Sequence, residues 1–304
     1  MTSAESVVAG VDLGGTGSRF VVSSGGAVRR QTTAPSRELG AGSTEERVSN
    51  LAAILRGLVP TGCRLAGVGI GASGPVELPL GVIRNPNTLP WFSGFDLAGS
   101  LRTELGVEVL VDNDAVTAAI GEYKCGAARD CNRPLVVTLG TGIGVALLEN
   151  GRPFRDASGQ HPECGHLPVF PSGPRCYCGL IGCWEMSASR RSLEARVEGV
   201  VGACDLQALE GLLAHDAPEA VTAAIDDYGH AVGRGLEALV IAYGPDRVVL
   251  GGSASRFLPY FSHGLRAELE RTSDFRRDLD VVESSLGDLA GAIGASVMVE
   301  LRGS

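Results

Sequence analysis

The chain has 304 residues, of which 44% are hydrophobic and 20% charged, and its formal net charge is −9. These values are typical of an ordinary globular protein of one large or two ordinary domains, so they exclude a disordered chain, a fibre and a single small module. Its acidity argues against a general nucleic-acid or membrane surface, and no apolar run approaches the roughly 18 residues of a membrane span. Residues 1–7 carry no basic leader, so we expect a cytoplasmic protein with no nucleic-acid or membrane partner.

The first part of the chain predicts a glycine-turned hairpin followed by alternating helices and strands. Two valine-rich runs at 6–12 and 20–22 flank Gly14-Gly15-Thr16, and the polar residues after them predict a loop up to a helix at 44–58. We then expect a strand at 65–70, a loop rich in Gly, Pro and Asn at 71–91 and a helix at 97–105. A buried strand at 107–111 and a helix at 115–123 follow.

The second part repeats the plan of the first. Residues 135–148 resemble 11–22 at an offset of 126, with Gly14 matching Gly140 and Gly25 matching Gly151, so we expect an internal duplication; chance similarity of two Gly-rich hairpins is the alternative. The remainder predicts mostly helix at 204–243 and a strand at 247–250 that ends in Gly251-Gly252. A helix at 256–271, a strand at 279–282 and a terminal helix at 288–301 follow. Alternating strands and helices predict an α/β fold.

Three glycine turns follow apolar strands, at Gly14-Gly15-Thr16, Gly140-Thr141-Gly142 and Gly251-Gly252. Backbone amides in such turns can converge on a phosphate, although a hairpin often needs glycine for its backbone angles alone. None of the three has the P-loop pattern or the Gly-x-Gly-x-x-Gly dinucleotide pattern that opens a helix. The turns therefore favour phosphate binding and disfavour an NAD-dependent dehydrogenase.

Asp112-Asn113-Asp114 stands where a buried strand passes into a helix. One aspartate there can be a helix cap and nothing more. Two carboxylates bracketing an asparagine favour chemistry, because a helix N-terminus stabilises an ionised carboxylate that can accept a proton from a substrate hydroxyl.

His166, Cys176, Cys178 and Cys183 have the spacing of a metal site in a reducing compartment. Three thiols and an imidazole in a loop bent by proline and glycine predict a closed, tetrahedral structural zinc site. Cys164 is the weaker candidate ligand, and we expect Cys63, Cys125, Cys131 and Cys204 to be small buried residues. Glu163 and Glu185 flank the loop and are either surface charges or acceptors for sugar hydroxyls.

Taken together, these motifs resemble the ROK family of bacterial sugar kinases and sugar-responsive repressors, over essentially the whole chain. The similar segments are Asp12-Leu13-Gly14-Gly15-Thr16, Asn113-Asp114-Ala115, Leu139–Gly144, Glu163-Cys164-Gly165-His166 and Cys176–Glu185, the last of which matches Cys-x-Cys-Gly-x-x-Gly-Cys-x-Glu. The resemblance implies two ribonuclease-H-like domains of the actin and hexokinase type with ATP and sugar in the cleft. We expect an N-terminal domain at 1–117, completed by a helix at about 288–304, and a larger domain with the zinc loop at 118–287.

The resemblance also implies roles for individual residues. Asp114 would be the general base, and the other sugar-binding positions would be Gly74, Asn87, Asn113, Glu163, His166 and Glu185. The ATP phosphates would lie on Gly14, Gly15 and Thr16 and on Gly140, Thr141 and Gly142, with adenosine near Gly251 and Gly252. Asp12 would face Mg²⁺, and His166 would also serve the structural Zn²⁺ together with Cys176, Cys178 and Cys183.

The resemblance implies an ATP-dependent hexose kinase that acts on the 6-hydroxyl of glucose, and a glucosamine-type, N-acetylated or 3-amino hexose is the alternative. Departures at Gly17, Val116, Val145 and the segment before Glu163 bear on which sugar is accepted. The repressor branch carries a DNA-binding helix-turn-helix before the first phosphate motif, where only eleven residues precede Asp12. A repressor and a catalytically idle sugar sensor are therefore the less favoured interpretations. Family members are often dimeric, so a homodimer is compatible with the sequence without being fixed by it.

Overall fold

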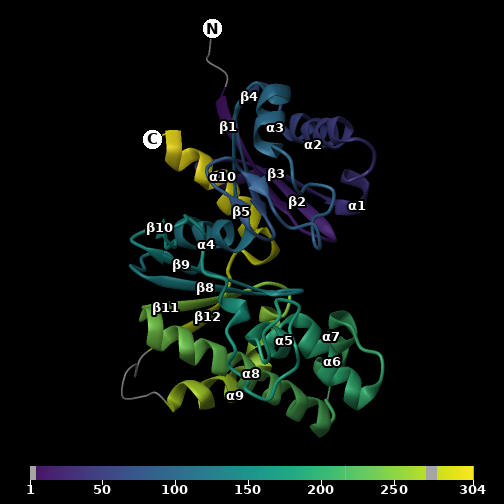
Figure 1. Cartoon of the computed structure of the whole chain (residues 1–304), viewed down its shortest axis with the longest axis vertical. Helices are drawn as coiled ribbons and strands as arrows, with labels where there is room; N and C mark the ends of the chain where they lie inside the picture. The colour runs from purple at the N-terminus through teal and green to yellow at the C-terminus, as the bar shows by residue number, and fades with distance from the viewer. Residues whose placement is uncertain (1–4, 216, 272–278, 304) are drawn as a thin grey trace. The chain divides into compact units, whose positions relative to one another are not determined.

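The computed structural model describes residues 5–215, 217–271 and 279–303, which form two compact units (Figure 1). The first unit comprises the residues up to Asn132, Ala146–Pro162 and the residues from Asp288 onward, and the second comprises Arg133–Val145 and Glu163–Gly287. Within the described ranges, no helix has the length and apolar character of a membrane span. The domain limits predicted from the sequence, 1–117 with 288–304 and 118–287, stay a prediction.

The first unit is built on a five-stranded sheet in the order β3-β2-β1-β4-β7. β1 pairs antiparallel with β2 and parallel with β4, and β4 pairs parallel with β7, so that Asp12, Gly71 and Asp112 are register partners across three strands. The strand bounds are β1 Glu5–Leu13, β2 Gly17–Ser24, β3 Ala27–Pro35, β4 Cys63–Ala72 and β7 Glu108–Asn113. The carboxyl ends of β1, β4 and β7 therefore meet at one edge.

β3 corrects the sequence prediction, which placed a loop before the first long helix. Nearly all side chains of β3 are exposed, so the segment carries no apolar alternation from which a strand could be recognised. Its backbone pairs with β2 along most of its length. The neighbouring strand, and not its own side chains, makes this segment extended.

The predicted helices of the first unit are confirmed at 44–58, 97–105 and 115–123. Ser43 and Glu46 form a reciprocal capping box at the start of α2, and Gly106 ends α3 in the left-handed conformation. The helix bounds are α1 Ser36–Leu39, α2 Thr44–Leu58, α3 Leu97–Leu105, α4 Asp114–Cys125 and α10 Ala290–Gly303, and the short strands are β5 Val76–Glu77 and β6 Val82–Ile83.

The two faces of the first sheet are covered by different helices. Alternate strand residues such as Val11 and Ile70 join the side chains of α2 and α3 in one apolar core. On the other face Gly10 and Gly69 lie against the backbone of α10, where an added Cβ would overlap carbonyl oxygens of that helix. Because side chains alternate along a strand, Asp12 lies on the same face as Gly10, toward α10.

The second sheet has the order β10-β9-β8-β11-β12. β11 pairs parallel with β8 and with β12, and Gly251 is the register partner of Thr138. The strand bounds are β8 Pro134–Leu139, β9 Ile143–Glu149, β10 Arg152–Pro153, β11 Arg247–Gly251 and β12 Asp280–Glu283. Each sheet thus has a hairpin, a third strand beyond it and two parallel strands on the other side, which confirms the predicted repeat.

The helices α5, α6 and α9 of the second unit pack against α8. The indole of Trp184, which is fully buried, lies against Gly235 and donates from Nε1 to Ala231 O at 3.0 Å. Gly229 lies equally close to the backbone of α9 at Phe261. The helix bounds are α5 Trp184–Ala188, α6 Arg190–Val201, α7 Leu206–Leu213, α8 Glu219–Tyr243 and α9 Leu258–Glu270. This packing fixes the segment that follows Cys183.

The prediction that four cysteines are buried was wrong. Cys63, Cys125, Cys131 and Cys204 are all partly exposed. Cys63 begins β4, Cys125 ends α4 and the other two lie in connecting segments. Such positions at the ends of elements leave a small side chain open to solvent, whatever its apolar character.

Candidate functional site

The carboxyl edge of the first sheet holds the predicted base. β7 ends at Asn113, whose side chain caps α4 by accepting from Ala115 N at 2.8 Å and Val116 N at 3.3 Å. Asp114 is the first residue of α4, and its Oδ1 accepts from Ala115 N at 2.9 Å. The strand and the cap together fix both side chains at the positive end of a helix, a position that suits a carboxylate.

Asp12 and Asp114 form an electrostatically strained pair. Burial, followed by repulsion from Asp114, raises the pKa of Asp12 to about 7, while Arg19 acts in the opposite direction. Burial also raises the pKa of Asp114 above its ordinary value, against hydrogen bonds from backbone amides and from Ser73. A half-buried carboxylate that resists ionisation is a better proton acceptor near neutral pH than an exposed one.

A glycine and an asparagine loop complete this edge. Asn113 Nδ2 donates to Gly74 O at 3.4 Å, and Gly74 has a φ of +104°, a conformation that side chains rarely adopt. An added Cβ at Gly74 would overlap Asn85, whose Nδ2 donates to Ser73 O at 3.2 Å. The structure therefore brings Gly74 and Asn113 together, whereas Asn87 lies exposed in the same loop. The place of these residues in a sugar site stays a prediction.

Sequence reasoning missed the arginine that supports this edge. Arg155 Nη2 donates to Asp112 Oδ2 at 2.5 Å, and Asp112 Oδ1 accepts from Asn113 N at 2.8 Å. Arg155 Nη1 also donates to Gly159 O at 3.1 Å, so it joins the segment before Glu163 to the end of β7. Nearby, burial holds the pKa of His161 below its ordinary value. The isolated Arg155 gave no sequence signal, because its partner lies 43 residues away.

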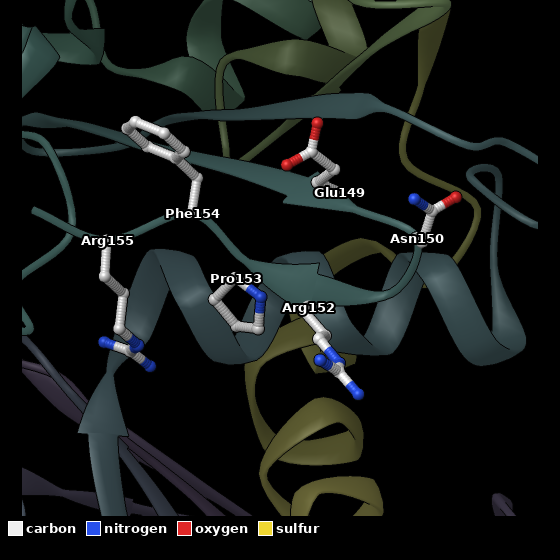
Figure 2. A pocket seen from close by; sticks show the side chains of 6 residues that line it. All are labelled: Glu149, Asn150, Arg152, Pro153, Phe154 and Arg155. Atoms are coloured by element: carbon white, nitrogen blue, oxygen red, sulfur yellow. The ribbon is translucent and has the colours of Figure 1, made fainter.

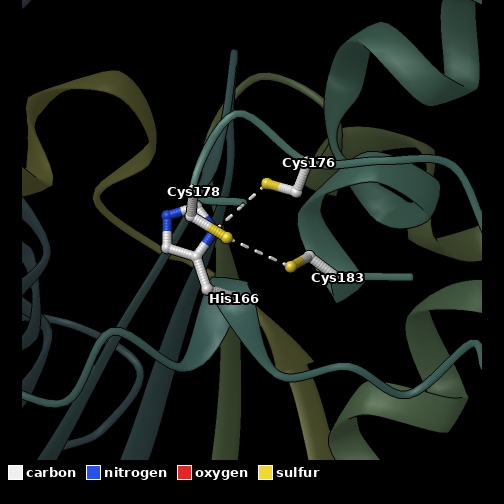
Figure 3. Close-up of side chains that lie close together, drawn as sticks. All are labelled: His166, Cys176, Cys178 and Cys183. Carbon is white, nitrogen blue, oxygen red and sulfur yellow. Dashed lines mark hydrogen bonds between the residues drawn. The ribbon is translucent and has the colours of Figure 1, made fainter. Parts of the chain in front are cut away.

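The four predicted metal ligands of the second unit come together (Figure 3). One ligand atom from each of His166, Cys176, Cys178 and Cys183 lies within 4.8 Å of the others. The Sγ atoms of Cys178 and Cys183 are 3.5 Å apart, and Cys176 Sγ is 3.5 Å from His166 Nδ1. Cys164 lies apart, with its Sγ 3.9 Å from the Tyr243 hydroxyl, in agreement with its weaker rank as a ligand.

These distances fit a tetrahedral zinc ion. Zinc–sulfur bonds of about 2.3 Å and zinc–nitrogen bonds of about 2.0 Å separate two sulfurs by roughly 3.8 Å, and a sulfur and a nitrogen by roughly 3.5 Å. Three thiols and one imidazole also form the donor set that zinc prefers for a closed structural site. His166 turns Nδ1 to the cysteines, which leaves Nε2 on the outer side, 3.2 Å from the Tyr177 hydroxyl.

Tyr177 connects the cluster to the carboxylates that flank it. Its ring stands edge-on to that of His166 at 5.1 Å between centroids, and the side chain is 75% exposed. Although the residue is largely exposed, desolvation of its hydroxyl end, together with the nearby charges of Glu185 and Glu163, raises the pKa of Tyr177. A hydroxyl donor, His166 Nε2 and two carboxylates therefore lie close together. Tyr177 could have been suspected from its place between two ligands.

The zinc loop is linked to the second glycine turn by Glu185. Its Oε2 accepts from Ile143 N at 2.9 Å, and a Cβ added at Gly142 would overlap the same carboxylate. The predicted adenosine turn lies beside this one, because Gly252, with a φ of +79°, lies against Leu139 and Ala254 N donates to Leu139 O at 3.0 Å. The fold thus joins two predicted phosphate and nucleotide turns at one edge of the sheet.

A separate hollow in the first unit contains none of the predicted residues. Figure 2 shows its side chains from β9, β10 and the residues around them, with Glu149 and Phe154 on one side of the strand pair and Arg152 and Arg155 on the other. Because these groups do not converge on one point, the hollow does not have the features of a binding site.

Comparisons with known proteins agree with this geometry. The family model described as ROK family matches residues 8–302. The chain is 31% identical to a glucokinase of Halalkalibacterium halodurans, over 96% of this chain and 94% of that protein. It is 30% identical to the xylose repressor of Bacillus subtilis over 77% of this chain, and it spans about 61% of that repressor's length.

The fold agrees as well. The structure of a ROK family glucokinase from Streptomyces griseus in complex with glucose and AMPPNP superposes with a TM-score of 0.82, at 26% identity, and covers 96% of this chain and 98% of that chain. The predicted α/β fold of the actin and hexokinase type, with two sheets of the same strand order, is therefore confirmed. The family match over nearly the whole length leads to one conclusion: the chain belongs to the ROK family.

Proposed function

We propose that this protein is an ATP-dependent sugar kinase that phosphorylates a hexose hydroxyl, with the 6-hydroxyl of glucose as the first candidate. The observation that carries the proposal is Asp114, a half-buried carboxylate of raised pKa at the start of α4, held beside Asn113 and Gly74. The similar glucokinase of Halalkalibacterium halodurans supports the same activity. So does the Streptomyces griseus glucokinase, whose structure is a complex with glucose and AMPPNP.

In the proposed reaction Asp114 accepts the proton of the sugar hydroxyl while that oxygen forms a bond to the γ-phosphorus of ATP. The bond between the γ-phosphorus and the bridging oxygen breaks, and ADP leaves with the electron pair. Asn113 and Gly74 would orient the sugar on the first unit, and Glu163, His166 and Glu185 are the proposed sugar-binding residues of the second unit. Little covalent work is needed, so alignment and exclusion of water supply most of the rate.

The backbone amides of two glycine turns would hold the phosphates. Gly14, Gly15 and Thr16 form the turn between β1 and β2, and Gly140, Thr141 and Gly142 form the turn between β8 and β9. Gly251 and Gly252 would border the adenosine. Amides that converge in such turns stabilise an anion without a side chain that would block its approach.

Two metals belong to the proposal. Asp12 fits a divalent cation, because burial and the nearby charge of Asp114 oppose its ionisation, and such an ion would stabilise the ionised carboxylate. Bound Mg²⁺ would supply charge neutralisation of the phosphates, with Asp12 facing it. Zn²⁺ held by His166, Cys176, Cys178 and Cys183 would fix the loop that carries Glu185.

The experiment that tests the activity is a coupled assay of ADP release with Mg-ATP. Glucose, mannose, N-acetylglucosamine, N-acetylmannosamine and an unacylated amino sugar are compared, with the Asp114→Asn variant as the blank. A large rate on one sugar that the variant lacks identifies the substrate. An equal rate in the variant would overturn the role of Asp114.

The similarity to a xylose repressor favours one second candidate, a sugar sensor without catalysis. The same protein distinguishes the two, because a sensor binds a sugar in calorimetry and releases no ADP with any of them. A kinase shows binding and turnover on the same sugar.

A further inference from the structure

We propose that Arg190 binds the phosphates of the nucleotide at the Gly140–Gly142 turn; this inference rests on the proposed kinase function. A nucleoside triphosphate carries several negative charges, and backbone amides alone do not neutralise them. Lys124 is the only lysine in the chain, and it lies in the last turn of α4, so arginines are the main candidates for a protein cation that meets the phosphates.

Arg190 contacts the phosphate turn twice. Its backbone N donates to Gly140 O at 2.9 Å, and its side-chain Nη2 donates to Thr141 Oγ1 at 3.3 Å. The two contacts hold the guanidinium at the turn whose amides would receive the phosphates. The side chain is 32% exposed, so a ligand at the turn can reach it.

The guanidinium also keeps most of its capacity for a ligand. One of its five N–H groups bonds Thr141, and Nε is buried without a hydrogen-bond partner within the described part of the chain. The donors that a ligand can reach are therefore those on Nη1 and Nη2. The guanidinium makes a long ion pair with Glu194, with 3.8 Å between Nη1 and Oε1. At that distance and exposure an ion pair contributes little, so the positive charge is largely uncompensated.

The arginines near the other two glycine turns are already neutralised. Beside the first turn, Arg19 lies between two carboxylates, 3.5 Å from Asp12 and 3.4 Å from Asp288. Beyond Gly251-Gly252, Arg256 pairs with Glu210 at 2.9 Å. Among the described arginines that border a glycine turn, Arg190 therefore offers the most available charge.

The position of Arg190 in its helix adds to this field. It is the first residue of α6, a helix of 12 residues whose N-terminal end lies at the turn. The positive end of the helix dipole and the guanidinium thus act on the same side of Gly140 and Thr141, and a planar guanidinium can donate two parallel hydrogen bonds to one phosphate.

The test compares Arg190→Gln with Arg191→Gln, which removes the same charge from the exposed neighbour on the same helix. Calorimetry measures the dissociation constants of Mg-ATP and of adenosine, which lacks phosphates. We expect Arg190→Gln to raise the dissociation constant of Mg-ATP about tenfold and to leave that of adenosine unchanged. The difference from the wild type should become smaller at high salt, because the lost interaction is between charges. Arg191→Gln should match the wild type for both ligands.

Two further outcomes would overturn the proposal. Equal Mg-ATP affinity in the two variants would show that Arg190 does not meet the phosphates. An equal loss of Mg-ATP and adenosine, reproduced by Thr141→Val, would show that Arg190 only holds the turn in shape. Failure of the proposed function is distinguishable, since the wild-type chain would then release no ADP with any sugar, whatever the behaviour of the Arg190 variants.

Discussion

The two glycine-turned hairpins share a fold but differ in what surrounds their turns. Both sheets run in the same strand order, and Gly14 and Gly140 occupy equivalent places in the repeat. The first turn is held by α1, through a hydrogen bond of 3.1 Å from Ser36 N to Thr16 O, and the strand before it carries Asp12, near a second carboxylate. The second turn is held by Glu185 and Arg190, which follow the zinc loop.

The difference shows how one supersecondary unit can serve two tasks. The edge with Asp12 and Asp114 carries two carboxylates, which suit proton transfer and a cation. The edge with Gly140–Gly142 carries the Glu185 carboxylate and the guanidinium of Arg190, the group that we propose meets an anion. Position 16 in the first turn is a threonine, whereas the equivalent position in the second turn is Gly142. The Glu185 carboxylate occupies the space that a side chain at position 142 would need. The strands are common to both, and the long-range partners differ.

The largest expected effect comes from removing the proton acceptor of the first unit. Asp114→Asn should lower kcat by roughly 10² to 10⁴, the usual contribution of a positioned base. Sugar and Mg-ATP affinities should stay near those of the wild type, because Asn keeps the size of the side chain. Steady-state kinetics with calorimetry measure both. A kcat close to that of the wild type would remove Asp114 from the role.

Disruption of the metal cluster should act on the second unit alone. Cys178→Ala should abolish stoichiometric zinc and weaken sugar binding roughly tenfold to a hundredfold, as expected for lost hydrogen bonds to charged groups. Mg-ATP binding should fall less, since backbone bonds from Arg190 to Gly140 and from Ala254 to Leu139 remain. Elemental analysis and calorimetry measure these values.

The control for the metal cluster is Cys204→Ala, which removes a partly exposed thiol outside the cluster. It should leave zinc content and both affinities unchanged. If Cys178→Ala abolishes sugar and nucleotide binding equally, the loss reports unfolding, and the separate role of the loop is contradicted.

A substitution within the second turn tests why it lacks the side chain of the first. Gly142→Ala should displace Glu185, break its bond to Ile143 N and weaken sugar binding about tenfold. Gly140→Ala is the matched control, because its added Cβ would meet only Gly142 O, at 3.8 Å. Similar sugar affinities in the two variants, measured by calorimetry, would contradict a role for Glu185.

The smallest expected effect is on stability. The pKa of Asp114 is raised in the folded state, so the ionised carboxylate destabilises the folded protein. This destabilisation is absent at a pH below the ordinary pKa of 3.8 and complete at a pH above the folded-state pKa. Asp114→Asn removes this cost and the repulsion from Asp12. Its Tm should therefore exceed that of the wild type by about 1–3 °C near neutral pH, and by less near pH 4.

Calorimetric scans between about pH 4 and pH 8 measure the difference, without added metal. A variant that is less stable than the wild type at neutral pH would show that the hydrogen bonds of Asp114 outweigh its desolvation.

The sequence by itself determined the local elements and the short motifs. Ser43 and Glu46 sit at cap spacing, and the helix at 44–58 was predicted with the observed bounds. The cysteine spacing predicted the cluster that the fold assembles, because its ligands lie within 18 residues in one loop. The repeat of Gly14 and Gly140 likewise predicted a glycine-turned hairpin in each half, and the two sheets each contain one.

Tertiary structure decided whatever depends on partners distant in the chain. β3 is a strand only because β2 pairs with it, since its own side chains are exposed. Arg155 contacts Asp112, 43 residues away in the sequence, and Arg190 contacts Thr141, 49 residues away. Neither contact could be predicted from the spacing of neighbouring residues. Periodicity and motifs report neighbours along the chain, whereas the charge around each glycine turn is set by side chains that only folding brings there.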